Sequence, residues 1–100
     1  MKKITLTVEN QLYGPAQYPA YADRGLCVYK LGRAWCVAHV ASGMTVDDRA
    51  RQPSKARACE LMADLLALPL DWDRPWDELR SDFGALAGDV RGVTTRYRPT

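Results

Sequence analysis

Four side chains of the types that bind zinc lie between residues 27 and 59, and they are the clearest candidates for chemistry. They are Cys27, Cys36, His39 and Cys59. A structural zinc site needs four ligands that converge at about 2.0–2.3 Å, commonly from paired cysteines in a turn. The three cysteines form no CxxC pair, and residues 36 and 39 of one predicted strand project to opposite faces. The spacing therefore predicts free thiols and no metal site.

Catalytic chemistry finds little support in the residue pattern. His39 is the only histidine, and no recognised nucleophile motif surrounds it. Asp47-Asp48 lie in a predicted connection, where carboxylates are typical of turns. The seven glycines are scattered, and no phosphate-binding GxxxxGK[ST] loop occurs. We therefore expect no catalytic residues and no cofactor, and a small enzyme built around His39 and a cysteine is the weaker alternative.

Length and composition indicate a single globular domain. The chain has 100 residues, of which 47% are hydrophobic and 26% are charged, as in ordinary globular proteins. No apolar run reaches the roughly 18 residues of a membrane span, and the alternation in Ile4–Val8 differs from the apolar block of a signal peptide. Unpaired cysteines indicate reducing surroundings. We therefore expect a cytoplasmic location, in its own cell or in a host cell, and no membrane partner.

Charged residues are segregated along the chain, although the net charge is only +2. Residues 49–57 contain four cations and no carboxylate: Arg49, Arg51, Lys55 and Arg57. Residues 58–90 contain eight carboxylates and two arginines, and three more arginines follow. Such blocks favour a partner that is selected by charge. The basic segment is either a contact for nucleic acid or a solvated connection.

An acidic segment interleaved with tryptophan is the second candidate contact. Trp76 falls on the apolar stripe of a predicted helix, whereas Trp72 is expected to be half exposed. Exposed aromatic side chains beside charges are typical of binding hot spots. The predicted contact residues of this segment are Asp71, Trp72, Asp73, Asp77 and Glu78. Alternatively, Trp72 covers the end of the preceding helix, and Asp71 or Asp73 caps the next one.

The first half of the chain predicts strands. Alternating apolar residues in Ile4–Val8 predict a half-buried strand. Residues 10–22 contain three tyrosines and two prolines without periodicity, and they predict a loop that is held against the body. Leu26–Lys30 and Trp35–Val40 predict a central hairpin that turns at Gly32-Arg33. After a turn at Ser42-Gly43, residues 44–46 predict a short further strand.

The second half predicts two helices. Ser54 is the expected N-cap of the first, and its apolar stripe comprises Ala58, Leu61, Met62, Leu65, Leu66 and Leu68. A second helix is expected with Pro75 in its first turn and with Trp76, Leu79, Phe83 and Leu86 on one face. From about residue 92 we expect a frayed basic tail, in which residues 93–97 could add an edge strand. The predicted core includes Val28, Val37, Leu61, Leu65 and Leu79.

These elements predict an α+β fold: a small, mainly antiparallel sheet of three to five strands with two helices on one face. Residues 25–68 resemble the arm-binding domain of tyrosine integrases and the plant-type three-stranded-sheet DNA readers. The resemblance rests on Trp35, Gly43, Ser54 and Ala58 within a strand–turn–strand–turn–strand–helix order. It implies a sheet that enters the major groove and a helix that braces it. The chain departs from these families in its acidic second helix and its apolar strands.

The function predicted from the sequence is that of a non-catalytic binding protein whose partner is a protein or a nucleoprotein complex. Small size, free thiols and segregated charge are similar in style to the counter-defence proteins of phages and mobile elements, anti-CRISPR proteins among them. That similarity implies an inhibitor of a host defence complex. The alternative is a DNA-binding domain of the integrase arm-binding type, with nucleic acid on the basic segment. The sequence leaves the oligomeric state open.

Overall fold

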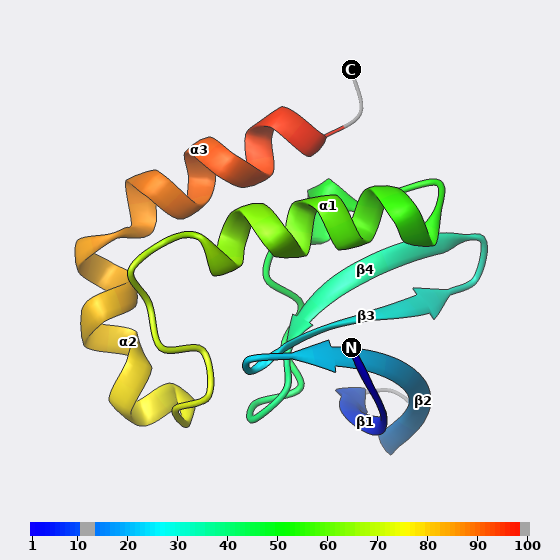
Figure 1. Ribbon diagram of the computed structural model, residues 1–100. Coiled ribbons are helices and arrows are strands. Elements are labelled where there is room, and N and C mark those ends of the chain that lie inside the picture. Colours follow the sequence, from blue (N-terminus) through cyan, green and yellow to red (C-terminus); the bar gives the residue numbers. More distant parts are fainter. Residues whose placement is uncertain (11–13, 99–100) are drawn as a thin grey trace.

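An antiparallel sheet followed by helices makes up the computed structural model, which describes residues 1–10 and 14–98 (Figure 1). The strands are β1 (Lys2–Asn10), β2 (Gly14–Asp23), β3 (Leu26–Leu31) and β4 (Ala34–His39), and they are paired in the order β1-β2-β3-β4. A 3₁₀ turn, η1 (Asp48–Ala50), precedes the helices α1 (Lys55–Leu66), α2 (Trp76–Ala85) and α3 (Ala87–Tyr97). The α+β class and the small antiparallel sheet are thereby confirmed.

The central hairpin turns at the predicted pair of residues, and this turn sets its register. Val28 pairs with Val37 and Tyr29 pairs with Cys36, and the connecting residues are Gly32 and Arg33. Residues 26–29 of β3 and 36–39 of β4 are all buried. A strand that is buried on both faces must be apolar on both faces, which is why this hairpin shows no polar alternation.

Residues 14–23 form a strand, so the predicted loop at about 10–22 is wrong over this range; residues 11–13 lie outside the described residues. β2 pairs with β1 from Gly14 to Ala22, but with β3 only through Ala20–Asp23. Pro15 and Pro19 lie where β1 is the only neighbour of β2, which is the kind of edge position at which a strand tolerates proline. Prolines in the middle of the segment therefore did not prevent pairing.

A curled β1–β2 ribbon covers the side of the sheet that faces away from the helices (Figure 1). The residues buried there form a second core: Leu6, Ala20, Cys27, Tyr29, Cys36 and Ala38. The ribbon lies close against the turn after β4. A Cβ added to Gly43 in that turn would lie only 2.3 Å from the carbonyl oxygen of Thr7 in β1. Both faces of the β3–β4 hairpin are consequently enclosed by the chain itself.

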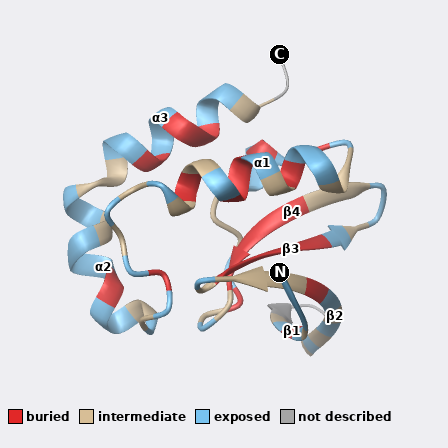
Figure 2. Ribbon diagram, viewed as in Figure 1, coloured by how far each residue is buried: buried red, intermediate tan, exposed pale blue. Residues whose placement is uncertain are grey.

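The opposite face of the sheet is covered by α1, which contacts both β3 and β4. Its buried residues are Ala58, Leu61, Met62 and Leu65 (Figure 2). The Ser54 hydroxyl accepts a hydrogen bond from the Arg57 amide at 3.2 Å, which confirms the predicted N-cap. Together with buried residues of the facing strands, of the other helices and of the loop before α2, the buried residues of α1 form the first core, in which the five predicted core residues are all buried. The buried residues of the first core are Leu26, Val28, Val37, Ala50, Ala58, Leu61, Met62, Leu65, Trp72, Leu79, Val90 and Val93.

Residues 87–97 form helix α3, so the predicted frayed tail and edge strand are both wrong. Val90 and Val93 belong to the first core, and Gln52 donates a hydrogen bond to the Tyr97 carbonyl at 2.7 Å. Apolar side chains at helical spacing thus find a partner in α1, and tertiary packing outweighs the weak helix propensity of a Gly- and Thr-rich segment. Among the described residues, no helix has the length and apolar character needed to cross a bilayer.

Two further predicted boundaries differ from the structure. Residues 44–46 do not form a strand, but Val46 and Gln52 each bond to the outer edge of β4 through backbone groups. That irregular segment satisfies the edge as a strand would. Helix α2 takes Pro75 as its N-cap, without a side-chain cap bond. Asp71 instead accepts the amide of Asp73 within the preceding loop, at 3.2 Å.

Candidate partner-binding surfaces

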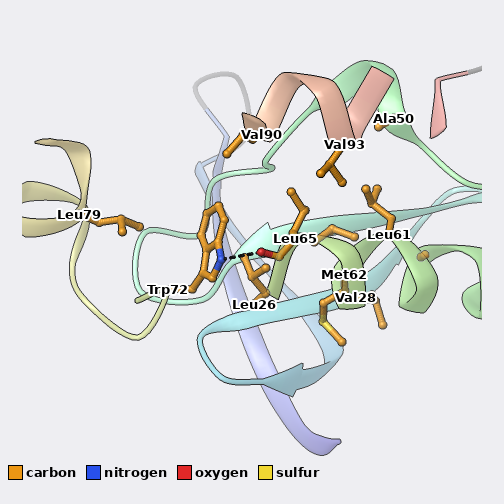
Figure 3. Close-up of a cluster of buried hydrophobic side chains, with 12 residues drawn as sticks. Leu26, Val28, Ala50, Leu61, Met62, Leu65, Trp72, Leu79, Val90 and Val93 are labelled. Carbon is orange, nitrogen blue, oxygen red and sulfur yellow. Dashed lines mark hydrogen bonds between the residues drawn. The ribbon is translucent and has the colours of Figure 1, made fainter. Parts of the chain in front are cut away.

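Trp72, predicted to be half exposed at a binding surface, is a core residue. Only 2% of its surface is exposed, and its indole nitrogen donates to the Leu65 carbonyl at 3.3 Å (Figure 3). Phe83 meets its ring edge-on at a centroid distance of 6.1 Å. Because the indole satisfies a carbonyl in the last turn of α1, the alternative prediction, that Trp72 covers this helix end, is the correct one.

His39 fixes the loop that carries Trp72 to the end of β4. The imidazole is 3% exposed, and its Nε2 lies 2.9 Å from the carbonyl oxygens of both Trp72 and Arg74. Carbonyl oxygens only accept, so Nε2 carries the proton. In the neutral ring Nδ1 then accepts from the Ser42 hydroxyl, 2.8 Å away. The histidine therefore joins β4, the turn after it and the loop before α2.

The Ser42–His39 pair has the distance of a nucleophile and its base, a feature that sequence reasoning missed. Its sequence signal is a serine three residues after the histidine, within a glycine turn. The Ser42 oxygen also accepts the Met44 amide at 3.2 Å, and the Gly43 amide is bonded to the His39 carbonyl. The nearest amides are thus engaged in the turn and do not form an oxyanion site. The hydrogen bond between Ser42 and His39 is therefore explained by its role in holding the turn after β4 in place.

The candidate zinc ligands do not converge. Cys27 and Cys36 belong to the second core, whereas His39 contacts Trp72 of the first core, on the other face of the sheet. Cys59 is half-buried on α1. Burial raises the pKa of the Cys27 thiol to about 11, against a small opposing effect of a backbone hydrogen bond. Among the side chains of residues 1–8 and 14–98, no three His, Cys, Asp or Glu groups are placed together to hold a metal ion.

Four predicted contact residues form an exposed acidic surface, defined here as Asp71, Asp73, Asp77 and Glu78. All four are exposed, on α2 and the loop before it. Arg74 lies among them, but its guanidinium binds the Asp82 carboxylate at 2.8 Å and the backbone carbonyl of Glu78 at 2.7 Å. In the part of the chain that the structure describes, none of these four carboxylates takes part in an ion pair. No ion pair among the described residues therefore neutralises these carboxylates; Asp77 and Glu78 lie in the first turn of α2, where the helix dipole favours negative charge.

The basic segment is divided by folding into two parts. The Lys55 ammonium lies 3.4 Å from the centre of the Tyr21 ring, a cation–π contact that occupies it. Arg57 is paired with Glu60 on the same helix. Arg49 and Arg51, by contrast, are exposed, and over the described residues neither takes part in an ion pair. Only half of the predicted basic contact therefore remains available to a partner.

Arg49 and Arg51 lie beside an arginine from the other end of the chain. Together with Asp48 and Arg98 they line one hollow. Arg98 binds the Asp47 carboxylate at 2.8 and 3.0 Å. Burial alone would raise the pKa of Asp47, but hydrogen bonds from Arg98 and from the Arg49 amide outweigh it and lower that pKa. This pair ties the end of α3 to η1 and brings arginines from two distant segments together.

Comparison with known proteins identifies no relative. No protein-family model matches the chain, and no curated protein or solved structure is significantly similar to it. The surfaces of the molecule are therefore the remaining guide to its function.

Proposed function

We propose that this chain is a non-catalytic binding protein that acts on a macromolecular partner through its acidic surface. The observation that carries the proposal is the set of four exposed carboxylates, at residues 71, 73, 77 and 78, without an ion pair among the described residues. Like charges that lack ion-pair partners repel one another, and complementary charge on a partner relieves that repulsion. The partner surface that fits is basic.

A protein or nucleoprotein partner is favoured over bare DNA by two observations. Phosphates would be repelled by the acidic surface. In addition, both faces of the β3–β4 hairpin are buried, with Cys27 and Ala38 at 0% exposed on the side away from the helices. A sheet that reads DNA in the manner implied by the integrase resemblance needs one open face for the groove. Arg49 and Arg51 remain the support for the DNA-binding alternative.

Within this class, we favour an inhibitor of a host defence complex that acts in the cytoplasm, in the manner of the anti-CRISPR proteins. The supports are a small α+β unit, buried thiols that suit reducing surroundings, and a charged contact surface. Such an inhibitor would act by occupying a basic site on its target and would need no chemistry of its own.

The acidic surface is tested by neutralising its charge without changing its shape. In one variant, Asp71→Asn, Asp73→Asn, Asp77→Asn and Glu78→Gln are combined, since an asparagine side chain at position 71 can still accept the backbone amide of residue 73. Affinity for the basic partner captured from host lysate should fall at least tenfold, and nuclease treatment should not abolish capture. Asp89→Asn, which removes an exposed acid of α3, is the matched control and should retain full affinity.

A duplex-binding assay separates the two candidate functions. If the proposal holds, affinity for a 20-base-pair duplex should be no tighter than about 10⁻⁴–10⁻⁶ M at physiological salt, which is the non-specific range. Sub-micromolar, sequence-selective binding that is lost in Arg49→Ala and Arg51→Ala would instead establish the DNA-binding alternative. Equal capture by the neutralised variant and the wild type would refute the role of the acidic surface.

A further inference from the structure

A small apolar slot lies between the turn after β4 and helix α2. It is lined by Met44 and Val46 of the turn segment and by Trp76 and Phe83 of α2, together with His39 and Trp72. Met44 is one of the large apolar side chains that are exposed, at 49%, and it stands at the rim. The rings of Trp76 and Phe83 meet at 5.3 Å and 67°, an edge-on contact that holds one wall in place. The slot is therefore preformed and open to a partner.

A second hollow, toward α3, shares two lining residues with the slot. Val46 and Phe83 line both hollows, and the second one is also lined by Val90, Arg91 and Arg98. Arg98 in turn lines the hollow that holds Arg49 and Arg51. We define these three neighbouring hollows, which share lining residues, as the groove; it has an apolar end at the slot and an arginine end at η1 and α3.

The arginine end carries an excess of positive charge. Its four arginines are at positions 49, 51, 91 and 98, and its two carboxylates are Asp47 and Asp48. Asp47 is neutralised by Arg98, and Arg91 is exposed without an ion pair among the described residues. An occupant of this end is consequently favoured when it carries carboxylates, because Arg binds them with charge-assisted, often bidentate hydrogen bonds.

We propose that the groove binds an acidic peptide segment with one short aliphatic side chain, which enters the slot while flanking carboxylates contact the arginine end. The slot volume is about 70 Å³, roughly half of the 150 Å³ cavity that accommodates benzene in another protein. A branched aliphatic side chain therefore fits better than an aromatic ring. Nucleic acid lacks an aliphatic anchor, so it would use the arginine end alone. This contact is separate from the acidic surface and goes beyond the function proposed for it.

Labelled peptides test the groove directly on the full-length protein. The probe is the peptide EEELEEE, and its controls are EEEAEEE, which lacks the anchor, and KKKLKKK, which reverses the charge. Fluorescence anisotropy should show EEELEEE binding at least fivefold more tightly than EEEAEEE, and KKKLKKK should not bind. In NMR spectra, the indole resonance of Trp76 should shift on addition of EEELEEE, which places the peptide at the slot.

Variants at exposed positions separate the groove from general effects of charge. Arg91→Glu should weaken EEELEEE binding at least tenfold, and Met44→Glu should weaken it at least fivefold. Arg33→Glu makes the same charge change at the exposed β3–β4 turn and should have less than a twofold effect. Combined Asp77→Asn and Glu78→Gln, which disturb the acidic surface, should not weaken the peptide complex, so the two proposals fail independently.

Three outcomes would overturn the proposal. EEELEEE could fail to bind at 1 mM. EEEAEEE could bind as tightly as EEELEEE, which would show that the leucine side chain does not contribute to binding. A ten-nucleotide single strand could bind more tightly than EEELEEE in an Arg91-dependent manner, and the arginine end would then be a nucleic-acid contact.

Discussion

At the scale of single residues, Cys27 couples the second core to pH. Its side chain is fully buried on β3, with 0% of the residue exposed. Burial raises the pKa of its thiol from 9.0 to about 11, because a thiolate would lose its hydration there. Burial likewise raises the pKa values of Cys36 and of the Tyr29 hydroxyl in the same core. Ionisation of these groups therefore opposes folding.

Stability should consequently decline in alkaline solution. The unfolded thiol loses its proton near pH 9.0, and the native Cys27 thiol keeps it until about pH 11. Between these values the unfolded state binds fewer protons, so the free energy of unfolding is intact below about pH 9 and falls as pH rises to 11, by about 2–3 kcal/mol. Urea denaturation at pH 8 and pH 10.5 measures the loss.

Two cysteine variants check that assignment. Cys27→Ala removes the buried titrating group. The free energy of unfolding of this variant should therefore fall less between pH 8 and pH 10.5 than that of the wild type, whatever the stability of the variant at pH 8. Cys59→Ala removes the half-buried thiol of α1 and should show the full wild-type loss. An identical pH dependence in all three proteins would contradict the role of Cys27.

At the scale of elements, the β2–β3 turn joins the sheet to the loop before α2. Arg24 and Gly25 connect the strands with φ values of 48° and 91°, and two positive values are the pattern of a type I′ hairpin turn. A Cβ at Gly25 would lie 2.2 Å from the carbonyl carbon of Trp72 and 2.4 Å from the amide nitrogen of Asp73. These are backbone atoms, so the loop cannot give way without moving Trp72.

Replacement of Gly25 by alanine should therefore lower the stability of the protein. For Gly25→Ala we expect the free energy of unfolding to fall by about 2–5 kcal/mol, because backbone strain and overpacking both contribute. Gly32→Ala is the matched control, because its φ is also positive, at 64°, but nothing lies within 4 Å of the added Cβ. It should cost only about 1–2 kcal/mol. Thermal denaturation measures both, and equal losses would show that the contact with the loop contributes nothing.

At the scale of the whole molecule, β3 and β4 are shared by two cores. Val28 and Val37 face the first core, and Tyr29 and Cys36 face the second. The β1–β2 ribbon covers one side of the hairpin, and α1 covers the other (Figure 2). Loss of packing on either side should therefore destabilise the same two strands.

The shared strands predict cooperative unfolding. Leu6→Ala removes a side chain that is 2% exposed in the second core and should cost about 2–5 kcal/mol. The tryptophans at positions 35, 72 and 76 lie on the side of the first core. Their fluorescence midpoint in urea should nevertheless shift with Leu6→Ala, together with the far-ultraviolet circular dichroism signal. A tryptophan transition that stays at the wild-type midpoint would show instead that the β1–β2 ribbon unfolds separately.

The sequence by itself determined those features that depend on neighbours along the chain. The register of the β3–β4 hairpin follows from a two-residue turn at Gly32-Arg33, and the buried face of α1 follows from apolar residues three and four apart after the Ser54 cap. Exposure of the acids at positions 71, 73, 77 and 78 follows from their charge, because ionised carboxylates are rarely buried without a partner. Each of these is a local property with a short-range cause.

Only the tertiary structure decided the features that need a distant partner. β2 forms because β1 supplies its hydrogen bonds, and α3 forms because α1 and η1 accept its apolar side. Trp72 is buried because the carbonyl of Leu65 and the imidazole of His39 hold its loop in place. The groove likewise joins residues that lie more than forty positions apart, from Met44 to Arg98. Periodicity cannot reveal such features, since the free energy that stabilises them comes from contacts that exist only after the chain has folded.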